Sequence, residues 1–248
     1  MKQYLLLFLL IFSINCSVFS QSDVKSIVRI GNDLVKLDRY AEALEKFDEA
    51  LDYLPSFAPA IDGKANLLIL MEDYKKASKI IEEAIKRNSD YPQFYLTKGI
   101  INIKKNKYED AVEDLGIALD LAQGLDDKVL ESKIYANRGA AYQKLLENEA
   151  ALNDYSKAIQ LDGNNPNVYL YRGFLYYQNN DHPEALKDFD SVIEIDPKNP
   201  FAYYNRGMIN FKQDKILEAC DDFHKACELG NNNACKMVIN HCITIRAQ

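Results

Sequence analysis

The stretch Pro166–Asn199, PNVYLYRGFLYYQNNDHPEALKDFDSVIEIDPKN, decides how the chain folds. This stretch of 34 residues predicts two short amphipathic helices joined by a polar turn. Tyr169 and Gly173 are four residues apart, so they share one face of the first helix. The polar residues 179–181 suit a turn, and Pro183 loses no hydrogen bond in the first turn of the second helix.

Small and apolar residues of the second helix complete this unit. Ala185, Phe189 and Val192 form its apolar stripe, and Pro197 ends it. Gly173 and Ala185 are small where the two helices would cross, which lets their backbones approach. One hairpin cannot bury such faces alone, whereas stacked copies cover one another. The sequence therefore predicts neighbouring copies of the unit.

Six copies of the unit are present. When they are aligned, four equivalent positions, here called columns, carry the same type of residue in each copy. The copies begin at Val24, Ala58, Pro92, Ser132, Pro166 and Pro200. The first small column contains Gly31, Ala65, Gly99, Gly139, Gly173 and Gly207. The second helix supplies an alanine column of Ala43, Ala77, Ala111, Ala151, Ala185 and Ala219. A large apolar column follows, with Phe47, Ile81, Leu115, Tyr155, Phe189 and Phe223. The last small column has Ala50, Ala84, Ala118, Ala158, Val192 and Ala226.

This pattern resembles the tetratricopeptide repeat (TPR). The resemblance implies an all-α fold, a right-handed α-solenoid of six helix-turn-helix repeats within a domain at 21–248. The expected repeats are 24–57, 58–91, 92–125, 132–165, 166–199 and 200–233, and a capping helix over 234–245 would cover the last apolar face. Residues 126–131 are an insertion, which either lengthens a helix, forms a loop on one rim or acts as a neutral spacer.

The first 20 residues are predicted to be a secretory signal peptide. Lys2 gives the positive start, residues 5–12 the apolar run, and Val18 and Ser20 the small residues before a cut. An uncut membrane anchor is the alternative, although the apolar run is short for a membrane span. We therefore expect an exported chain, periplasmic or secreted, whose mature part does not span a membrane.

Cys16 raises a further alternative, a lipid anchor. Residues 13–15 depart from the usual pattern before a lipidated cysteine, so this alternative has weaker support than cleavage. The net charge of −7 disfavours a nucleic-acid partner, because a phosphate backbone would be repelled on average. The charges are mixed in sign along the helices, which is typical of a solvated outer face.

Four cysteines lie at the C-terminal end, and their spacing is symmetric. Cys220, Cys227, Cys235 and Cys242 are separated by seven, eight and seven residues. In an antiparallel hairpin centred on Asn231, Cys227 faces Cys235 and Cys220 faces Cys242. We predict these two disulfides, which suit an oxidising compartment. The stretch ACELGNNNAC (226–235) also resembles the Cys-rich Sel1-like repeats.

Three other uses of these cysteines compete. A zinc ion held by four thiolates is disfavoured, because residues seven apart lie about 10 Å apart along a helix. A smaller Cys/His site that includes His224 is conceivable. A thiol redox switch has less support, since no Cys-x-x-Cys is present.

No pattern in the sequence indicates an active site. The histidines are His182, His224 and His241, and neither a phosphate loop nor a nucleophile elbow occurs. Adjacent acids such as Asp221 and Asp222 point apart on a helix. We expect the acidic residues to be solvated, and we expect a protein that is not an enzyme and needs no cofactor or metal.

The resemblance implies that the first helix of each repeat lines a concave groove. The groove residues it indicates are Asn137, Leu170, Tyr171, Phe174, Tyr177, Tyr204, Asn205, Met208 and Phe211. Aromatic groove residues commonly anchor a partner segment, while the alternative is that several of these pack between repeats. Asn137 and Asn205 would bond either a bound peptide or their own helices.

These observations favour a non-catalytic scaffold that binds a protein or peptide segment in its groove. The family's lysine–asparagine–arginine clamp for a C-terminal carboxylate is not expected, because Val28 replaces its lysine and Gly63 its second asparagine. The alternative function is a structural or self-associating component of a cell-envelope assembly. The identity of the partner and the oligomeric state do not follow from the sequence.

Overall fold

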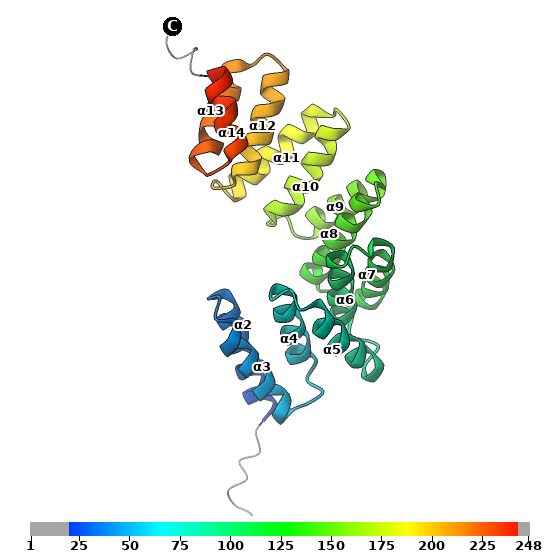
Figure 1. Ribbon diagram of the computed structural model, residues 1–248. Helices are drawn as coiled ribbons and strands as arrows, with labels where there is room; N and C mark the ends of the chain where they lie inside the picture. The colour runs from blue at the N-terminus through cyan, green and yellow to red at the C-terminus, as the bar shows by residue number, and fades with distance from the viewer. Residues whose placement is uncertain (1–19, 243–248) are drawn as a thin grey trace, which may run out of the picture. The chain divides into compact units, whose positions relative to one another are not determined.

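The computed structural model describes residues 20–242, which form helices and short turns without a strand. Consecutive helices pair as hairpins, so the all-α solenoid expected from the repeats is confirmed (Figure 1). The predicted signal residues 1–19, Cys16 among them, lie outside the described part. The chain divides into two compact units, residues 1–97 and 98–248.

The first unit is built around Phe47, whose side chain is completely buried. Two glycines make room for its ring, because a Cβ added at Gly31 or Gly63 would come within 3.0 or 2.6 Å of it. The small column thus allows close contact between the helices. The helices of this unit are α2 (Gln21–Lys36), α3 (Tyr40–Tyr53), α4 (Ala58–Leu70), α5 (Tyr74–Arg87) and the start of α6 (Pro92–Lys104).

The second unit continues the hairpins from the end of α6. Its helices are α7 (Tyr108–Ala122), α8 (Lys128–Lys144), α9 (Asn148–Leu161), α10 (Pro166–Gln178), α11 (His182–Ile195), α12 (Pro200–Lys212), α13 (Ile216–Glu228) and α14 (Asn232–Met237). The inserted residues mainly lengthen α8, which begins at Lys128 with Asp127 as its N-cap and has 17 residues, compared with 13 in α10. The insertion therefore extends a helix and does not form a rim loop.

Four aspartates of the second helices are buried, contrary to the expectation that acidic residues are solvated. Each side chain lies directly before the large apolar column and pairs with a basic residue sixteen positions earlier. The pairs are Lys98–Asp114, Arg138–Asp154, Arg172–Asp188 and Arg206–Asp222. The sequence interpretation was wrong here because the partner lies on the other helix of the hairpin. A buried carboxylate is tolerated only when it is paired and hydrogen-bonded in this way.

The four ion pairs are called the ladder below, and its arginines also lie over tyrosine rings. Arg138 lies 5.5 Å from the ring of Tyr135 and 5.7 Å from that of Tyr142, and Arg172 has the same surroundings in the next repeat. Such contacts stabilise a cation by about 0.5–1 kcal/mol. Arg206 further bonds Asp190 of the preceding repeat at 2.7 Å. The ladder therefore joins the two helices of a repeat and also joins neighbouring repeats.

The last hairpin closes the second unit. After α13 the chain turns at Gly230, with φ +93°, and then forms α14 and a π-helical turn, η1 (Val238–Cys242). The expected capping helix over 234–245 thus begins two residues earlier and is α-helical only to Met237; residues 243–248 are outside the described part. Met237 and Val238 pack against Phe223, as a cap requires.

The cysteines are joined in the pairs that the symmetric spacing predicts. Cys220 is bonded to Cys242, with Cα atoms 5.6 Å apart, and Cys227 to Cys235, with Cα atoms 4.7 Å apart. Cys220 and Cys242 are buried in the core of the hairpin. The first pair fixes the end of η1 to α13, and the second closes the short turn between α13 and α14.

Candidate functional site

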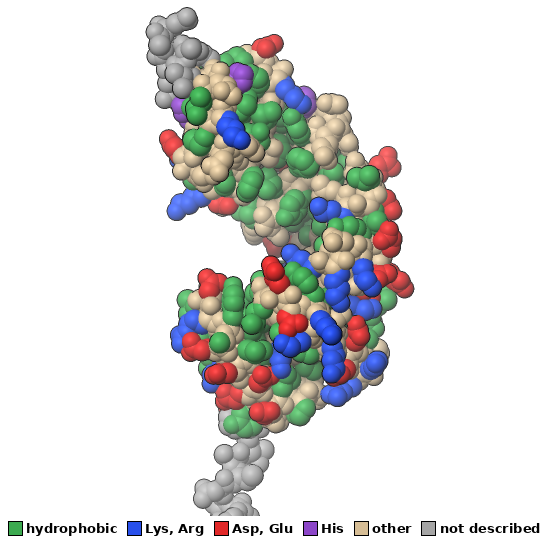
Figure 2. Space-filling view, viewed as in Figure 1, with side chains coloured by type: hydrophobic (Ala, Val, Ile, Leu, Met, Phe, Trp, Pro, Cys, Tyr) green, Lys and Arg blue, Asp and Glu red, His purple; other side chains and the backbone are tan. Residues whose placement is uncertain are grey.

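The second unit contains a groove of about 1370 Å³. It is lined by the first helix of each of its repeats, namely the end of α6, then α8, α10 and α12, and finally by the turn before α14. These helices succeed one another along the array, so the groove runs from the end of α6 to the C-terminal turn. Figure 2 shows mainly apolar and uncharged side chains over α10 to α14, on the face in view.

Six of the nine groove residues expected from the sequence line this groove. They are Asn137, Leu170, Tyr171, Phe174, Tyr204 and Asn205. Tyr171 and Phe174 are 46% and 38% exposed, unusually open for side chains of this size. The Tyr171 ring lies 6.1 Å from that of the buried Tyr155, which supports it from below. These side chains offer a partner two apolar contacts held on a rigid helix.

Tyr177, Met208 and Phe211 do not line the groove. Tyr177 packs beside Phe189 and Ile209, and Lys212 Nζ lies 4.4 Å from its ring. Met208 and Phe211 pack onto the core of the last hairpin, where the Phe211 ring is 6.3 Å from that of Phe223. The physical reason is that the second helix of the hairpin and the element that follows it need apolar contacts on the same helices. These three residues follow the packing alternative that the sequence left open.

Several groove residues were missed. Phe201 is 57% exposed and Leu146 is 84% exposed, and both line the groove. The spacing of Phe201 to Tyr204 would have placed them on one helix face. Leu146 lies in a turn, and the groove's C-terminal end is the turn 230–233, so helix periodicity gives no signal for either.

Amide side chains are abundant along the groove. Asn137 and Asn205 each donate Nδ2 to a backbone oxygen of their own helix, at 2.8 Å in both cases, so each fixes its own helix. Six others form no side-chain hydrogen bond with another described residue: Asn148, Asn167, Gln178, Asn179, Asn232 and Asn233. An amide both donates and accepts, so these groups match the alternating N–H and C=O of an extended peptide.

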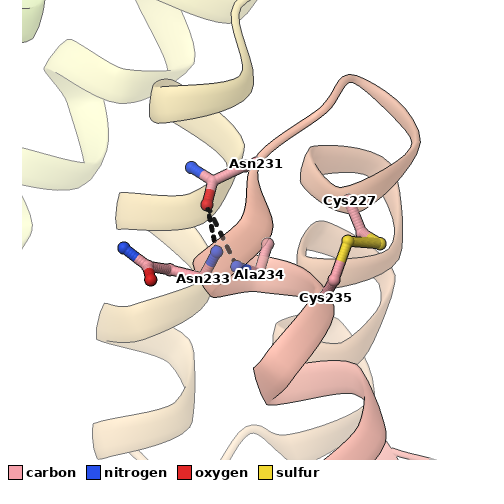
Figure 3. The surroundings of a disulfide bond; sticks show 5 residues. All are labelled: Cys227, Asn231, Asn233, Ala234 and Cys235. Carbon is pink, nitrogen blue, oxygen red and sulfur yellow. Dashed lines mark hydrogen bonds between the residues drawn. A yellow bond between two sulfur atoms is a disulfide. The ribbon is translucent and has the colours of Figure 1, made fainter.

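The turn at the C-terminal end of the groove is held firmly (Figure 3). Asn231 Oδ1 accepts hydrogen bonds from the backbone N–H groups of Asn233 and Ala234, both at 3.0 Å. The Cys227–Cys235 disulfide brackets the same turn. A surface that is already ordered loses less conformational entropy when it binds a ligand. The disulfide therefore orders one end of the groove as well as the last hairpin.

Leu146 occupies a strained position. Its φ is +63°, in the left-handed region, whereas the equivalent turn residues of the other five repeats are all polar: Asp38, Glu72, Asn106, Asn180 and Asp214. This conformation costs a leucine about 1–2 kcal/mol, and it costs an asparagine less. An exposed leucine at such a position indicates a use other than stability.

We expect Leu146→Asn to raise the free energy of unfolding by about 0.5–1 kcal/mol, because it relieves backbone strain without losing buried surface. Urea unfolding followed by circular dichroism measures the change. Leu217→Asn is the matched control, since Leu217 is 66% exposed but has no positive φ. A loss of stability in the Leu146 variant would contradict the strain argument.

The buried Tyr155 predicts that the stability of the protein depends on pH in the alkaline range. Its side chain is fully buried and its hydroxyl donates to Gln143 Oε1 at 2.9 Å. Burial raises the pKa of this phenol well above its ordinary value of 10.0. The unfolded chain then loses this proton first, so above pH 10 the stability falls with rising pH by up to about 1.4 kcal/mol per unit.

We expect Tyr155→Phe to flatten the decline in stability between pH 10 and pH 11. The variant also loses the bond to Gln143, but that loss is the same at each pH and does not alter the slope. Urea midpoints measured at several pH values give the two slopes. Parallel curves for the variant and the parent protein would contradict a raised Tyr155 pKa.

Among residues 20–242, no group of three or more His, Cys, Asp or Glu side chains is placed to hold a metal ion. No helix in the same range is long and apolar enough to cross a membrane. The groove offers aromatic, amide and two lysine side chains, Lys104 and Lys144. This chemistry is suited to holding a segment of another molecule.

The fold and the groove define a repeat protein of the interaction type, and comparison with known families agrees. Models of the tetratricopeptide repeat match residues 34–101 and, as overlapping repeats, residues 147–180 and 175–214. Together these matches span more than half of the chain. The chain belongs to the tetratricopeptide repeat family.

Solved structures show the same fold at low sequence identity. PilF of Pseudomonas aeruginosa has a TM-score of 0.73 with 18% identity, over 84% of this chain and 92% of that one. A chain of the APC/C hetero-tetramer Cut9–Hcn1 has a TM-score of 0.75 with 14% identity, over 88% of this chain and 43% of that one. YrrB, described as a TPR protein with an unusual peptide-binding site, has a TM-score of 0.57 with 21% identity, over 81% of this chain and 96% of that one.

Among characterised proteins, dynein axonemal assembly factor 4 of Pongo pygmaeus is 29% identical over 107 residues, which are 42% of this chain and 26% of that protein. The protein of the same name from Rattus norvegicus is 30% identical over 104 residues, 41% of this chain and 25% of that one. The chain therefore spans about a quarter of the length of these relatives.

Proposed function

We propose that this protein is an exported, non-catalytic scaffold that holds an extended segment of a partner protein in the groove of residues 98–242. The TPR fold supports a protein-interaction role. The observation that carries the proposal is the lining of the groove, where Tyr171, Phe174 and Phe201 stay exposed beside amides that have no partner within the described chain. Exposed aromatics on rigid helices are typical anchors of an interface.

A peptide segment suits this lining better than a small molecule. The groove is long, open and built from successive helices, which matches a chain that lies across several repeats. Amides along it pair with the main chain of the segment, and the aromatic rings receive its side chains. YrrB, which shares the fold, is described as having a peptide-binding site.

Export is the second part of the proposal. Two disulfides in one hairpin support an oxidising compartment, because cytosolic thiols are kept reduced. The signal-like residues 1–20 are a sequence argument of independent origin. Alkylation of intact cells followed by mass analysis checks this part: we expect Cys220 and Cys242 protected until a reductant is added, in a chain that begins at Gln21.

Photo-cross-linking tests the groove. We would place a photoreactive phenylalanine analogue at Phe174 and, as the matched control, at Leu217, which is 66% exposed but outside the groove. The expected result is a discrete cross-linked partner peptide at Phe174 that is absent at Leu217 and is lost when Tyr171 is changed to alanine. Equal cross-linking at both sites would contradict groove binding.

A further inference from the structure

The groove has an unusual charge for this protein. Asp and Glu outnumber Lys and Arg by 37 to 30 in the chain, yet no carboxylate lines the groove. Its two charged side chains are Lys104 and Lys144, both exposed. The charge carried by the groove lining itself is therefore positive, and low-dielectric walls concentrate the field of such charges.

These two lysines differ from the basic residues that face the second helix of each hairpin. Lys98, Arg138, Arg172 and Arg206 are each paired with a buried aspartate. Lys104 and Lys144 form no ion pair with another residue in 20–242. Each is the last residue of its helix, α6 and α8, so they have the same place in neighbouring repeats. The charge of the two groove lysines is therefore not neutralised by another residue in 20–242.

Apolar side chains lie next to this charge. Leu146 is two residues beyond Lys144, is 84% exposed and is held at a φ of +63° where the other repeats have polar residues. Further along, Tyr171 and Phe174 of α10 and Phe201 of α12 provide ring faces. The groove is therefore polarised, with its lysines and the exposed leucine in its first two repeats and the exposed aromatic rings, with most of the unpartnered amides, in its last two.

We propose that the segment held in this groove is acidic at one end, with a carboxylate between Lys104 and Lys144 and apolar side chains on Leu146, Tyr171 and Phe201. This inference rests on the proposed function and adds the chemistry and the direction of the partner segment. A carboxylate is the complement of two unpaired ammonium groups, and the amides hold the extended main chain that links the acidic end to the apolar part. A basic segment is rejected at the lysine end by like-charge repulsion.

A positional-scanning set of nine-residue peptides tests this with the full mature chain. Each position is fixed in turn as Asp, Lys or Phe while the others are mixed, and each peptide is made with a free and with an amidated C-terminus. We expect enrichment of Asp near one end, enrichment of Phe towards the other and depletion of Lys. The free and amidated forms distinguish a terminal carboxylate from an aspartate side chain.

Variants then assign the charge to the two lysines. Lys104→Gln with Lys144→Gln is expected to weaken the preferred acidic peptide about tenfold and to reduce the salt dependence of its binding. The matched control is Lys133→Gln with Lys157→Gln, two exposed lysines of the same unit outside the groove, which should bind as the parent does. Leu146→Asn should weaken binding while the protein itself becomes more stable.

The possible results separate the two proposals. Peptides that bind with no preference for acid, or binding unchanged in the Lys104 and Lys144 variant, would overturn the acidic segment and leave groove binding intact. A folded protein that binds none of the peptides would overturn both. Light scattering that finds a dimer lost on Tyr171→Ala would make a second copy the occupant and would also overturn the acidic segment.

Discussion

Replacing Asp188 with alanine is expected to lower the free energy of unfolding by about 3–5 kcal/mol. The Asp188 side chain is 4% exposed and accepts two hydrogen bonds from Arg172, at 2.9 Å from Nε and 2.7 Å from Nη2. Burial raises the pKa of this carboxyl, and the hydrogen bonds and charge of Arg172 oppose that shift. Removing the carboxylate leaves a largely buried guanidinium without its counter-charge.

The effect extends beyond one repeat. Arg172 also donates from Nη1 to Ser156 of the preceding repeat at 3.1 Å, so a displaced guanidinium disturbs two neighbouring hairpins. Repeat arrays derive much of their stability from such interfaces between neighbours. Hydrogen exchange should therefore show lost protection in α9 to α12 and less change at α13.

Urea unfolding of two further variants separates this explanation from a general effect of losing charge. Glu228→Ala removes an exposed pair with Lys225 and should change the stability by less than about 0.5 kcal/mol. Arg172→Met with Asp188→Leu removes both charges and should recover most of the stability. An Asp188→Ala variant as stable as the parent protein would refute the role of the ladder.

Removal of the Cys220–Cys242 disulfide is the second large effect. Changing both cysteines to alanine is expected to cost about 3 kcal/mol, because the bond closes a loop with a sequence separation of 22 residues and restricts the unfolded chain. Both side chains are also buried against Phe223, so truncation adds a packing loss. The cap, α14 with η1, should detach first.

The second disulfide supplies the comparison. Cys227–Cys235 spans only eight residues, so its removal should cost less, about 2.5 kcal/mol or below, while loosening the turn 230–233 at the groove end. Thermal unfolding of the two double variants, each measured beside the reduced parent protein, shows which disulfide contributes more to stability. Equal melting temperatures for the parent and the Cys220–Cys242 variant would contradict a stabilising bond.

The pairing itself has a direct check. Mass mapping of the non-reduced protein should link the peptide that contains Cys220 to the one that contains Cys242, and Cys227 to Cys235. The pairing follows from sequence because two helical turns span about seven residues, so symmetric spacing in a hairpin brings both pairs into register. Crossed links or free thiols in the purified protein would refute it.

The sequence by itself determined the helices and the packing of consecutive helices as pairs. These depend on periodicity: Gly31 and Phe47, for example, recur as columns because each repeat buries the same contact. Together with the resemblance to the tetratricopeptide repeat, it also placed Tyr171, Phe174 and Tyr204 on the inner face. Local spacing is sufficient for such inferences because a helix fixes which residues share a face.

Only the tertiary structure decided which inner-face residues remain open. Tyr177, Met208 and Phe211 have the same helical spacing as the groove residues, but the second helix of their own hairpin and the element that follows it cover them. The buried partner of Arg172 was hidden for a similar reason, since Asp188 lies on the other helix of the hairpin. Exposure and ion pairing depend on what packs against a face, and that depends on contacts between residues distant in sequence, which a periodic pattern does not record.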